Sequence, residues 1–428
     1  MSSRKKINNE IGRGIYMVKV GRYTSALLLV LVGTALLIDQ TRSTSYLDKI
    51  IEWWPVIIIS FGVEYLWFQT KRNKGKDIKV DVKAVIISVM TVLILFGVTS
   101  GFPFLNQLDL VYYRSASEND IKFEKKDELI TLSENTSKLY IENLNGIIEL
   151  QPTEEKELKI ETTVYVSSMD QENAKSIADE SIIKWNNESA STFQVFAIGK
   201  EYYKYGLKYK PRINLIVHVP EGKELDIQLV MKNGSAIAAD LSILNDLNVD
   251  TTNGNIYIAN IKGNVVADTT NGMIEVYDIE GETVLDTTNG DIFAEDIAGD
   301  LIADTTNGRI SGELIDGKVV ADTTNGSIQL EEVYDNVTAD TTNGSIKVKS
   351  GSIDGRWDLD TTNATIEIIV PENEDFSFRA KASRRAFSSD FPFQIDDSVM
   401  EGVVGRGEFK IEANTSNGSV SVKKLSVD

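Results

Sequence analysis

Hydrophobic and polar residues follow two different patterns along this 428-residue chain. Near the N-terminus, apolar residues form three nearly continuous runs, at about 23–38, 53–68 and 84–105. Farther along, they alternate with polar residues over many short stretches. A run of about 20 apolar residues is typical of a membrane-spanning helix, whereas alternation indicates a strand with one buried face. The pattern therefore predicts a three-helix transmembrane region followed by an all-β region.

A five-residue signature, Asp-Thr-Thr-Asn-Gly, recurs every 18 residues in the alternating part of the chain. A seventh copy begins at Asp360 after a step of 20 residues, with Ala364 in place of the glycine. Self-similarity at a fixed period indicates an array of stacked units. The six full copies contain Asp250, Asn253, Gly254, Asp268, Asn271, Gly272, Asp286, Asn289, Gly290, Asp304, Asn307, Gly308, Asp322, Asn325, Gly326, Asp340, Asn343 and Gly344.

The residues between signatures define each unit. Isoleucine stands two residues after each glycine, as at Ile256, and a second apolar position follows at Ile261. A bend at Gly263 then leads into another alternating stretch that ends in the next signature. Each repeat is therefore predicted to hold two or more short strands. Stacking at ~4.8 Å per coil gives an all-β solenoid, that is, a β-helix of 18-residue coils.

The signature is interpreted as a structural corner of the coil. Asn-Gly accepts the positive φ angles of a tight turn. The first threonine is expected to point inward and to bond to its copies above and below. The aspartates point outward, where stacked carboxylates repel by about 1 kcal/mol per pair in water. A hydrogen bond from each carboxylate to the backbone N–H two residues on is the favoured compensation, and bound Ca²⁺ is the alternative. No other cofactor and no catalytic or metal site is predicted.

Imperfect copies flank the array. The segment 414–418 reads Asn-Thr-Ser-Asn-Gly and starts 54 residues after Asp360 (414 − 360), which is three periods of 18. Upstream, Asn145-Gly146 and Asn233-Gly234 look like earlier corners that are out of register, and 169–185 reads as an amphipathic helix. We therefore expect a linker and N-terminal cap over 106–235 and the solenoid with a C-terminal cap over 236–428.

Positive charges predict how the apolar runs are oriented. Six Lys or Arg residues precede the first run within 1–22, and six more lie in 71–83, between the second and third runs. The positive-inside rule places both segments in the cytoplasm and everything after residue 105 outside. No small-residue cleavage site follows the first run, which argues against a cleaved signal peptide. The prediction is a multi-pass plasma-membrane protein with an extracellular C-terminal domain.

Composition removes several classes of function. The chain has no cysteine and one histidine, His218, which excludes disulfides, thiolate metal sites and multi-histidine metal sites. Residues 1–102 carry 14 Lys+Arg and 7 Asp+Glu, a net charge of +7. Because the whole chain has a net charge of −20, residues 103–428 have a net charge of −27. The basic part suits an anionic lipid bilayer. The acidic part is unsuited to nucleic acid, whose phosphates it would repel.

Three features are candidate contact surfaces. Tyr202, Tyr203, Tyr205 and Tyr209 alternate with lysines and could stack on sugars or grip an anionic cell-wall polymer; alternatively, they form a hairpin that packs on the cap. Arg384, Arg385 and Phe387, with Phe391 and Phe393, form either a partner-binding loop or a cover over the end of the core. The outward positions Val266, Val284, Ile302 and Val320 are expected to align, either as an exposed apolar stripe or as a surface that the rest of the domain covers.

Two parts of the chain resemble known families. The segments LLLVLVGTALLIDQ and IIEWWPVIIISFGVEYLW, within 20–70, resemble the helical hairpin that opens LiaF-type envelope-stress proteins of Gram-positive bacteria. That resemblance implies a regulatory role beside a membrane sensor kinase. The DTTNG repeats, IENLNGIIEL and ANTSNGSVSVKKL resemble, over 125–428, the "putative adhesin" β-strand-repeat family with its LiaG-type members. That resemblance implies a β-solenoid.

The sequence favours a non-enzymatic, membrane-anchored protein that senses stress or acts as a scaffold at the cell envelope. Its partners are expected to be the lipid bilayer and a membrane sensor kinase or a cell-wall polymer. The first alternative is a surface adhesin or a module that binds cell-wall polymers. A polysaccharide-acting enzyme is a more remote alternative, because aspartates that recur in every coil do not make one unique site.

Overall fold

The computed structural model describes residues 120–425, apart from 168–169, 188–190, 205–206, 242 and 384–385, and also residues 18–20, 30, 34, 63–64, 66 and 78–80. The chain divides into two compact units: residues 1–112 with 203–208, and residues 113–202 with 209–428. The three expected transmembrane helices lie almost entirely outside the described residues. In the first unit, β1 (Val18–Val20) pairs in parallel with β2 (Ile78–Val80). Among the described residues, no helix has the length and apolar character needed to cross a bilayer.

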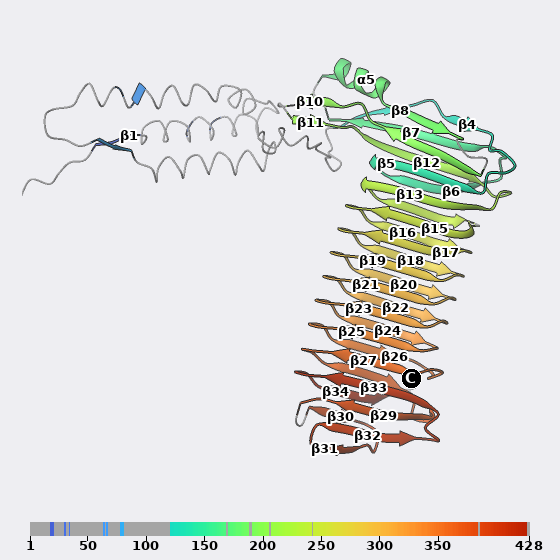
Figure 1. The fold of residues 1–428 in the computed structure, drawn as a ribbon, viewed down its shortest axis with the longest axis vertical. Coiled ribbons are helices and arrows are strands. Elements are labelled where there is room, and N and C mark those ends of the chain that lie inside the picture. Colours follow the sequence, from blue (N-terminus) through green and yellow to red (C-terminus); the bar gives the residue numbers. More distant parts are fainter. Residues whose placement is uncertain are drawn as a thin grey trace, which may run out of the picture. The chain divides into compact units, whose positions relative to one another are not determined.

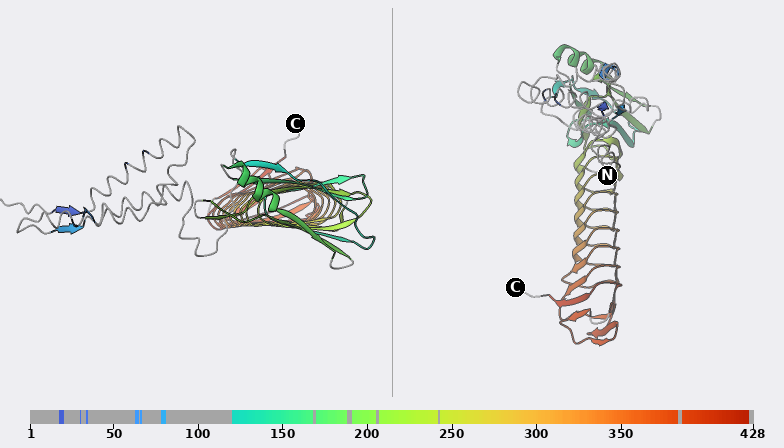
Figure 2. Two further views of the ribbon diagram at one scale, coloured as in Figure 1. Left: turned by 90° about the horizontal axis from the view of Figure 1, so that it is seen from above. Right: turned by 90° about the vertical axis from the view of Figure 1, so that its left-hand side faces the viewer.

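The second unit is built from two 15-stranded sheets that face each other (Figure 1; Figure 2). Sheet 1 contains β3 (Ile121–Glu124), β4 (Glu128–Ile130), β6 (Ile148–Thr153), β7 (Leu158–Val166), β12 (Arg212–Pro220), β14 (Ala236–Leu241), β16 (Ile256–Ile261), β18 (Ile274–Ile279), β20 (Ile292–Ile297), β22 (Ile310–Ile315), β24 (Ile328–Val333), β26 (Ile346–Lys349), β28 (Ile366–Val370), β30 (Phe387–Ser389) and β34 (Val420–Lys424). Sheet 2 contains β5 (Lys138–Asn145), β8 (Ile182–Asn186), β9 (Thr192–Ile198), β13 (Leu225–Asn233), β15 (Ile243–Thr251), β17 (Asn264–Thr269), β19 (Thr283–Thr287), β21 (Leu301–Thr305), β23 (Val319–Thr323), β25 (Val337–Thr341), β27 (Trp357–Thr361), β29 (Phe376–Lys381), β31 (Gln394–Asp396), β32 (Val399–Val404) and β33 (Phe409–Thr415).

Each 18-residue repeat gives one strand to each sheet, and equivalent strands pair in parallel. In sheet 1, Ile274 of β18 pairs with Ile292 of β20. In sheet 2, Asp268 of β17 pairs with Asp286 of β19. Because the period equals the coil length, each residue stacks on its own copy in the next coil. The predicted β-solenoid and its two strands per coil are confirmed.

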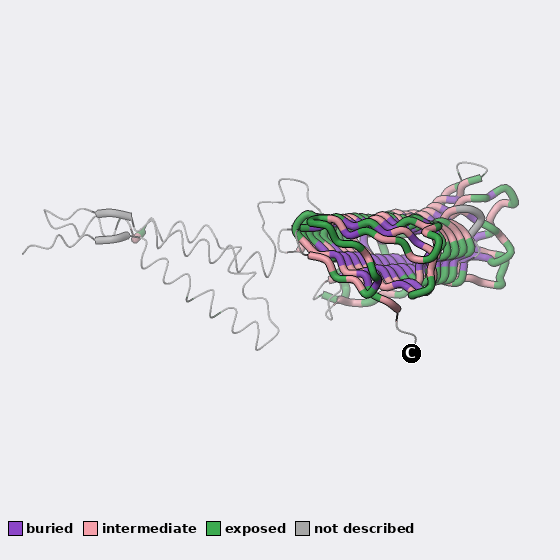
Figure 3. The backbone as a smooth tube through the Cα atoms, turned by 90° about the horizontal axis from the view of Figure 1, so that it is seen from below, coloured by how far each residue is buried: buried purple, intermediate pink, exposed green. Residues whose placement is uncertain are grey.

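The core lies between the two sheets (Figure 3). The isoleucine that follows each corner is buried in every coil; Ile274, for example, is 0% exposed. The 20-residue step before the seventh copy brings Trp357 into the position that Val337 holds one coil earlier, and Trp357 is 0% exposed. Continuous burial of apolar surface along the axis is the main stabilising term of such a stack.

A second bend interrupts six sheet 1 strands, from β14 to β24, with a residue at positive φ. In β16, for example, Asn260 has φ 54° and is skipped in the pairing with β18. The equivalent positions are Asp240, Asn260, Asp278, Asp296, Leu314 and Glu332. Asn and Asp tolerate this left-handed conformation better than other non-glycine residues, which explains four of the six.

The N-terminal end of the solenoid is covered by α5 (Gln171–Glu180), which packs on β7 and β3. Asp170 caps the helix by accepting from the N–H of Glu172, and Ile177 faces the core. The helix is shorter than the expected 169–185. It ends where both the N–H and the Oγ of Ser181 donate to Ile177 O, after which β8 pairs with β9.

The coil pattern starts well before the expected boundary at 235. Strand β13 pairs in parallel with both β5 and β15, and β14 pairs with both β6 and β16, so each sheet is continuous across that residue. Gly146 N donates to Asn233 O and Gly234 N donates to Asn253 O, both at 3.0 Å. The two upstream corners are therefore in register in space, although the sequence between them is too long to show it.

At the other end, the chain leaves the stack after β28 and returns in β33. Asn414 pairs with Asp360, so the last coil is in phase as expected. The intervening segment extends sheet 2 with β29, β32 and β31 and sheet 1 with β30.

Candidate functional site

The corner glycines are required for close stacking rather than for their φ angles. A Cβ on Gly308 would lie 1.7 Å from the carbonyl oxygen of Gly290 in the previous coil. Of the stacked corner glycines from Gly146 to Gly418, Gly146 alone has a positive φ. The expectation that Asn-Gly supplies positive φ at these corners is wrong. At the corners that carry glycine, the backbone of the previous coil occupies the place that a side chain would need; the one alanine of the row, Ala364, follows a step of 20 residues.

The corner asparagines form a continuous ladder of side-chain hydrogen bonds. Asn307 Nδ2 donates to Asn289 Oδ1 at 2.8 Å, and Asn325 Nδ2 donates to Asn307 Oδ1 at 2.8 Å. The same bond links each step from Asn233 to Asn417. An amide is both donor and acceptor, so each asparagine can bond in both directions along the axis. This explains why asparagine is repeated, a role that the turn interpretation missed.

The first threonine of each signature points inward, as expected, but does not bond to its copies. Thr305 Oγ1 donates to Gly290 O at 3.0 Å, and the equivalent bond recurs in the neighbouring coils. Thr305 is 1% exposed, so this bond satisfies a buried hydroxyl and a corner carbonyl together. Glycine, asparagine and threonine thus all act in holding one coil to the next.

The aspartates of the signature form an outward-facing row on sheet 2, from Asp250 to Asp360. Their backbones are paired in register, as at Asp286 and Asp304. The expected bond from each carboxylate to the N–H two residues on is not formed in the described coils. In four of them that N–H donates to the previous coil instead, as Thr306 N does to Thr287 O. Burial, and then the charges of Asp286 and Asp322, raise the pKa of Asp304.

The pKa values of Asp268 and Asp340 are raised for the same reasons, burial first and the neighbouring aspartates second. Within the part of the chain that the structure describes, no three acidic or histidine side chains converge to hold a metal ion. The row is one carboxylate wide, whereas Ca²⁺ takes six to eight oxygen ligands. The geometry gives no enclosed Ca²⁺ site at the corners.

Beside the aspartate row, the expected apolar stripe is present on the outer face of sheet 2. Val266, Val284, Ile302 and Val320 are paired in register along four successive strands. Val266 and Ile302 are each 37% exposed, which is high for a β-branched residue in a central strand. A β-branched residue suits a strand and packs on its copies in the neighbouring coils, but neither reason requires an apolar side chain, since Thr338 holds the next position of the row.

On the same face, the charges of the last coils are paired. Arg356 lies 2.6 Å from Glu412 and 3.2 Å from Asp358, and Arg379 lies 3.3 Å from Glu401. The aspartate row from 268 to 340 has no such ion pair in the described structure. Acidic residues on sheet 2 are therefore neutralised at the C-terminal end and left unneutralised in the regular coils.

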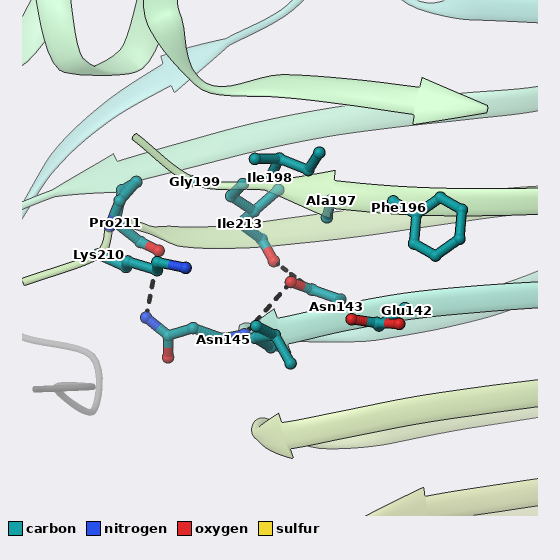
Figure 4. Close-up of a pocket in the computed structure, with 11 residues that line it drawn as sticks. Glu142, Asn143, Asn145, Phe196, Ala197, Ile198, Gly199, Lys210, Pro211 and Ile213 are labelled. Atoms are coloured by element: carbon teal, nitrogen blue, oxygen red, sulfur yellow. Dashed lines mark hydrogen bonds between the residues drawn. The ribbon is translucent and has the colours of Figure 1, made fainter. Parts of the chain in front are cut away.

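A cavity of about 180 Å³ lies at the N-terminal end, where β5, β9 and the start of β12 meet (Figure 4). Its polar side chains are already used: Asn143 Nδ2 donates to Ile213 O at 2.7 Å, and Asn145 Nδ2 donates to Pro211 O at 3.2 Å. These bonds attach β5 to the segment that leads into β12. The arrangement is that of a structural junction rather than a ligand site.

The tyrosine segment falls partly outside the described residues, which omit Tyr205. Strand β10 (Tyr202–Lys204) pairs with β11 (Leu207–Tyr209), as the hairpin interpretation expected. The rings of Tyr202 and Tyr209 stack with centroids 5.9 Å apart, and Tyr202 packs against the core. Tyr203 is 73% exposed. A sugar or polymer contact at this segment stays a prediction.

The phenylalanines near the C-terminus cover the end of the core. Phe391 is 6% exposed, and Phe393 stacks on Phe378 with ring centroids 5.1 Å apart. Phe387 is partly buried against the same core, whereas Arg384 and Arg385 lie outside the described residues. The covering role is therefore the one that the structure supports.

The paired sheets and corner ladders extend over almost the same residues as a known family. Residues 136–423 match the family described as Toastrack DUF4097. The chain belongs to this family. The match to Toastrack begins at residue 136, so the resemblance of residues 20–70 to LiaF-type proteins stays a prediction.

Solved structures similar to this Toastrack protein have low sequence identity. A crystal structure of a "putative cell adhesion protein" from Clostridium sporogenes is 11% identical, with a TM-score of 0.21, and covers 71% of this chain and 100% of its own. A "putative lipid binding protein" from Parabacteroides distasonis is 14% identical (TM-score 0.32; 72% and 98% covered). A "putative adhesin" from Bacteroides fragilis is 12% identical (TM-score 0.25; 72% and 98% covered). No curated protein matches the chain.

Proposed function

We propose that this protein is a non-enzymatic, membrane-anchored component of the bacterial cell envelope, whose solenoid presents a binding surface outside the membrane in a sensing or scaffolding role. The observation that carries the proposal is the outer face of sheet 2. There, an apolar row and a carboxylate row run side by side over consecutive coils, and the carboxylates from Asp268 to Asp340 form no ion pair or side-chain hydrogen bond in the described structure. Outward side chains that repeat in this way along a sheet face are typical of a binding surface.

The repetition also favours binding over catalysis. A catalytic site needs different groups that converge at one place, such as a base, an orienting partner and a stabilising donor. Here the same residue types recur in every coil at the same position, and the polar groups at the corners are engaged in inter-coil bonds. Such a surface suits the binding of a ligand that extends along the solenoid axis better than it suits catalysis at one bond of a substrate.

The pairing of β1 with β2 supports the proposed membrane topology. Strand β1 belongs to the basic segment before the first apolar run, and β2 belongs to the basic loop between the second and third runs. Two segments can pair directly only when they are on the same side of a bilayer. The positive-inside rule assigns both to the cytoplasm.

Because the chain has no cysteine, single introduced cysteines test the topology cleanly. Thr306→Cys places a thiol at an exposed corner of the solenoid, and Asn73→Cys places one in the basic loop. A membrane-impermeant maleimide applied to intact cells is expected to label Thr306→Cys at once and Asn73→Cys only after lysis. Labelling of Asn73→Cys alone in intact cells would place the solenoid in the cytoplasm and contradict the proposal.

Photo-crosslinking in cells tests the sensing role. A photoreactive residue at Ile302, on the apolar row, is expected to capture an envelope component, whereas the same residue at Glu295, on the outer face of sheet 1, serves as the matched control. A further photoreactive residue within residues 1–112 tests regulation. Crosslinking of a sensor kinase or another membrane protein at that position would support a regulatory role. Equal yields of the same products at both solenoid positions would count against a specific surface on sheet 2.

A second candidate function is that of a cell-wall polymer-binding module, motivated by Tyr203, which is 73% exposed and precedes Lys204. Peptidoglycan sedimentation of the full chain is expected to be lost on Tyr203→Ala if this candidate is correct. Sedimentation that does not change, or that is absent from the outset, removes it.

A further inference from the structure

We infer that the outer face of sheet 2 binds a cationic amphipathic helix, with the helix axis along the solenoid axis. Its apolar side lies on the row from Val266 to Val320, and its lysines or arginines face the row from Asp250 to Asp340. The inference rests on the proposed function in one respect, since it names the class of partner for the binding surface described above.

The two rows are close enough for one helix to cover both. Val266 and Asp268 are two residues apart on β17 and both point outward, so their side chains stand about 7 Å apart by the rise of a strand. An α-helix with its side chains is about 10–12 Å across. Its apolar stripe and one charged flank therefore reach both rows at once.

The apolar row supplies the contact surface. Val266 and Ile302 remain 37% exposed although they sit in the middle of a sheet. Thr338 takes the next position along the row after Val320, which shows that a polar residue is compatible with it. The four β-branched residues form a stripe about 14 Å long by the strand spacing.

Charge complementarity selects a cationic partner. The aspartates beside the stripe have no ion pair in the described structure, while Arg356 and Arg379 neutralise acids on the same face only in the last coils. On the other side of the stripe, the residues two before Val266, Val284, Ile302 and Val320 are Asn264, Glu282, Asp300 and Lys318. Lys318 is thus the one cation among these four flanking positions, and the flank on the other side consists of aspartates.

The spacing of the rows favours a helix over an extended strand. Successive aspartates along the row are separated by the strand spacing of about 4.8 Å. The turns of an α-helix repeat every 5.4 Å, whereas side chains on one side of an extended strand repeat at about 6.7 Å. Six aspartates span about 24 Å, which equals the length of a helix of about 16 residues. The mismatch per turn is about 0.6 Å, within the reach of flexible lysine side chains.

The test uses the full chain in a nonionic detergent and an 18-residue peptide of leucine and lysine. Its sequence places leucine on one helical face with lysine on both flanks. A photoreactive leucine analogue at the centre of the apolar face locates the contact by mass spectrometry. A peptide of identical composition with scrambled order controls for general charge attraction, and a glutamate-for-lysine peptide controls for apolar adsorption.

Two sets of variants separate the rows. Asp286→Asn, Asp304→Asn and Asp322→Asn together remove three charges, and asparagine is compatible with this row because Asn414 occupies it naturally. Val284→Thr with Ile302→Thr removes exposed methyl groups but keeps β-branching. The matched control, Glu275→Gln with Glu295→Gln and Glu313→Gln, removes three charges from the outer face of sheet 1. Circular dichroism and thermal unfolding verify that each variant is folded.

The expected result is crosslinking to residues of β17–β25 and a Kd that rises about tenfold in the triple aspartate variant, from three exposed pairs of about 0.5 kcal/mol each. The Kd is also expected to rise severalfold in the double threonine variant and to stay unchanged in the control. Equal binding of the scrambled peptide, crosslinks elsewhere, or equal loss in the control variant would overturn the inference. So would the absence of any peptide binding.

The topology experiment above separates the two failures. A solenoid that is labelled outside the cell but does not bind the peptide overturns the helix inference alone. A solenoid that is labelled only after lysis overturns the proposed location. The peptide measurement then still tests whether sheet 2 binds a cationic helix.

Discussion

Replacing one corner glycine, Gly308→Ala, tests whether close backbone stacking is what holds the coils together. A Cβ at this position would lie 1.7 Å from Gly290 O and 2.5 Å from Gly290 C, both backbone atoms that cannot rotate away. The corner must therefore move outward by more than 1 Å, to reach an ordinary contact distance of about 3.4 Å or more. Such a movement separates two coils at the corner where side-chain hydrogen bonds link them.

The expected cost follows from the bonds that the movement breaks. Thr305 Oγ1 to Gly290 O (3.0 Å), Asn307 Nδ2 to Asn289 Oδ1 (2.8 Å) and Asn307 N to Thr288 O (3.0 Å) all cross this gap. Three bonds at about 1 kcal/mol each give about 3 kcal/mol, and strain from overpacking adds about 1–3 kcal/mol. We therefore expect Gly308→Ala to lower the free energy of unfolding by about 4–6 kcal/mol.

The measurement is equilibrium urea unfolding of the full chain in mild detergent, followed by the far-ultraviolet circular dichroism of the β-sheets. Gly222→Ala is the matched control, because a Cβ there meets nothing within 4 Å and its stability is expected to change by less than about 1 kcal/mol. Ala364, which replaces glycine in the seventh copy, keeps its corner bonds, as Thr361 Oγ1 donates to Gly344 O at 2.9 Å, but it follows a step of 20 residues and has two more residues to adapt with than the 18-residue coil of Gly308. A Gly308→Ala protein as stable as the control would show that any corner can adapt to a Cβ as the corner of Ala364 does. That result would refute the stacking argument.

Three further predictions concern the repeat. Leu314 has φ 55°, so Leu314→Asn is expected to be more stable than Leu314→Ala by about 1 kcal/mol in urea unfolding. Both variants lose the leucine contacts, but asparagine accepts the left-handed conformation. Equal stability of the two variants would contradict this. Asn307→Asp should destabilise the protein by about 1–2 kcal/mol more than Asn307→Ala at neutral pH, since it sets a carboxylate against Asn289 Oδ1 and replaces a donor by an acceptor; a smaller loss for aspartate than for alanine would be inconsistent with the ladder. Burial and neighbouring carboxylates raise the pKa of Asp304, so the charged carboxylate lowers the stability of the fold above that pKa. This loss disappears as the pH falls toward 3.8, the ordinary pKa of an aspartate. Asp304→Asn should therefore raise the unfolding temperature at pH 7 and change it less at pH 4; a difference that grows toward acid pH would have the wrong sign.

The regular part of the fold could be predicted from the sequence because its period is also its geometry. When a motif returns every 18 residues, each residue meets its own copy, and the pairing of Asp268 with Asp286 needs no knowledge of distant contacts. The same logic placed Asn414 in phase with Asp360. Where the period fails, between Gly146 and Gly234, no pattern in the sequence shows that β5 and β13 are neighbours.

The candidate surface was only partly visible beforehand. Parity along a strand was enough to place Val266 and Ile302 on the outside. It could not show that the aspartates lack the local turn bond, because that depends on whether the relevant N–H is already bonded to the previous coil, as Thr306 N is. Nor could it show which acids are neutralised, since Arg356 reaches Glu412 across 56 residues of sequence.

The amino-acid sequence by itself determined the coil length, the two strands per coil and the inward or outward direction of each repeated side chain. These properties are local, or they repeat at a fixed interval, so alternation and period define them. Only the tertiary structure decided what the corner residues do: glycine makes room for the neighbouring backbone, asparagine bonds along the axis and threonine caps a glycine carbonyl. These roles arise between coils rather than within one, at distances that no single copy of the motif contains.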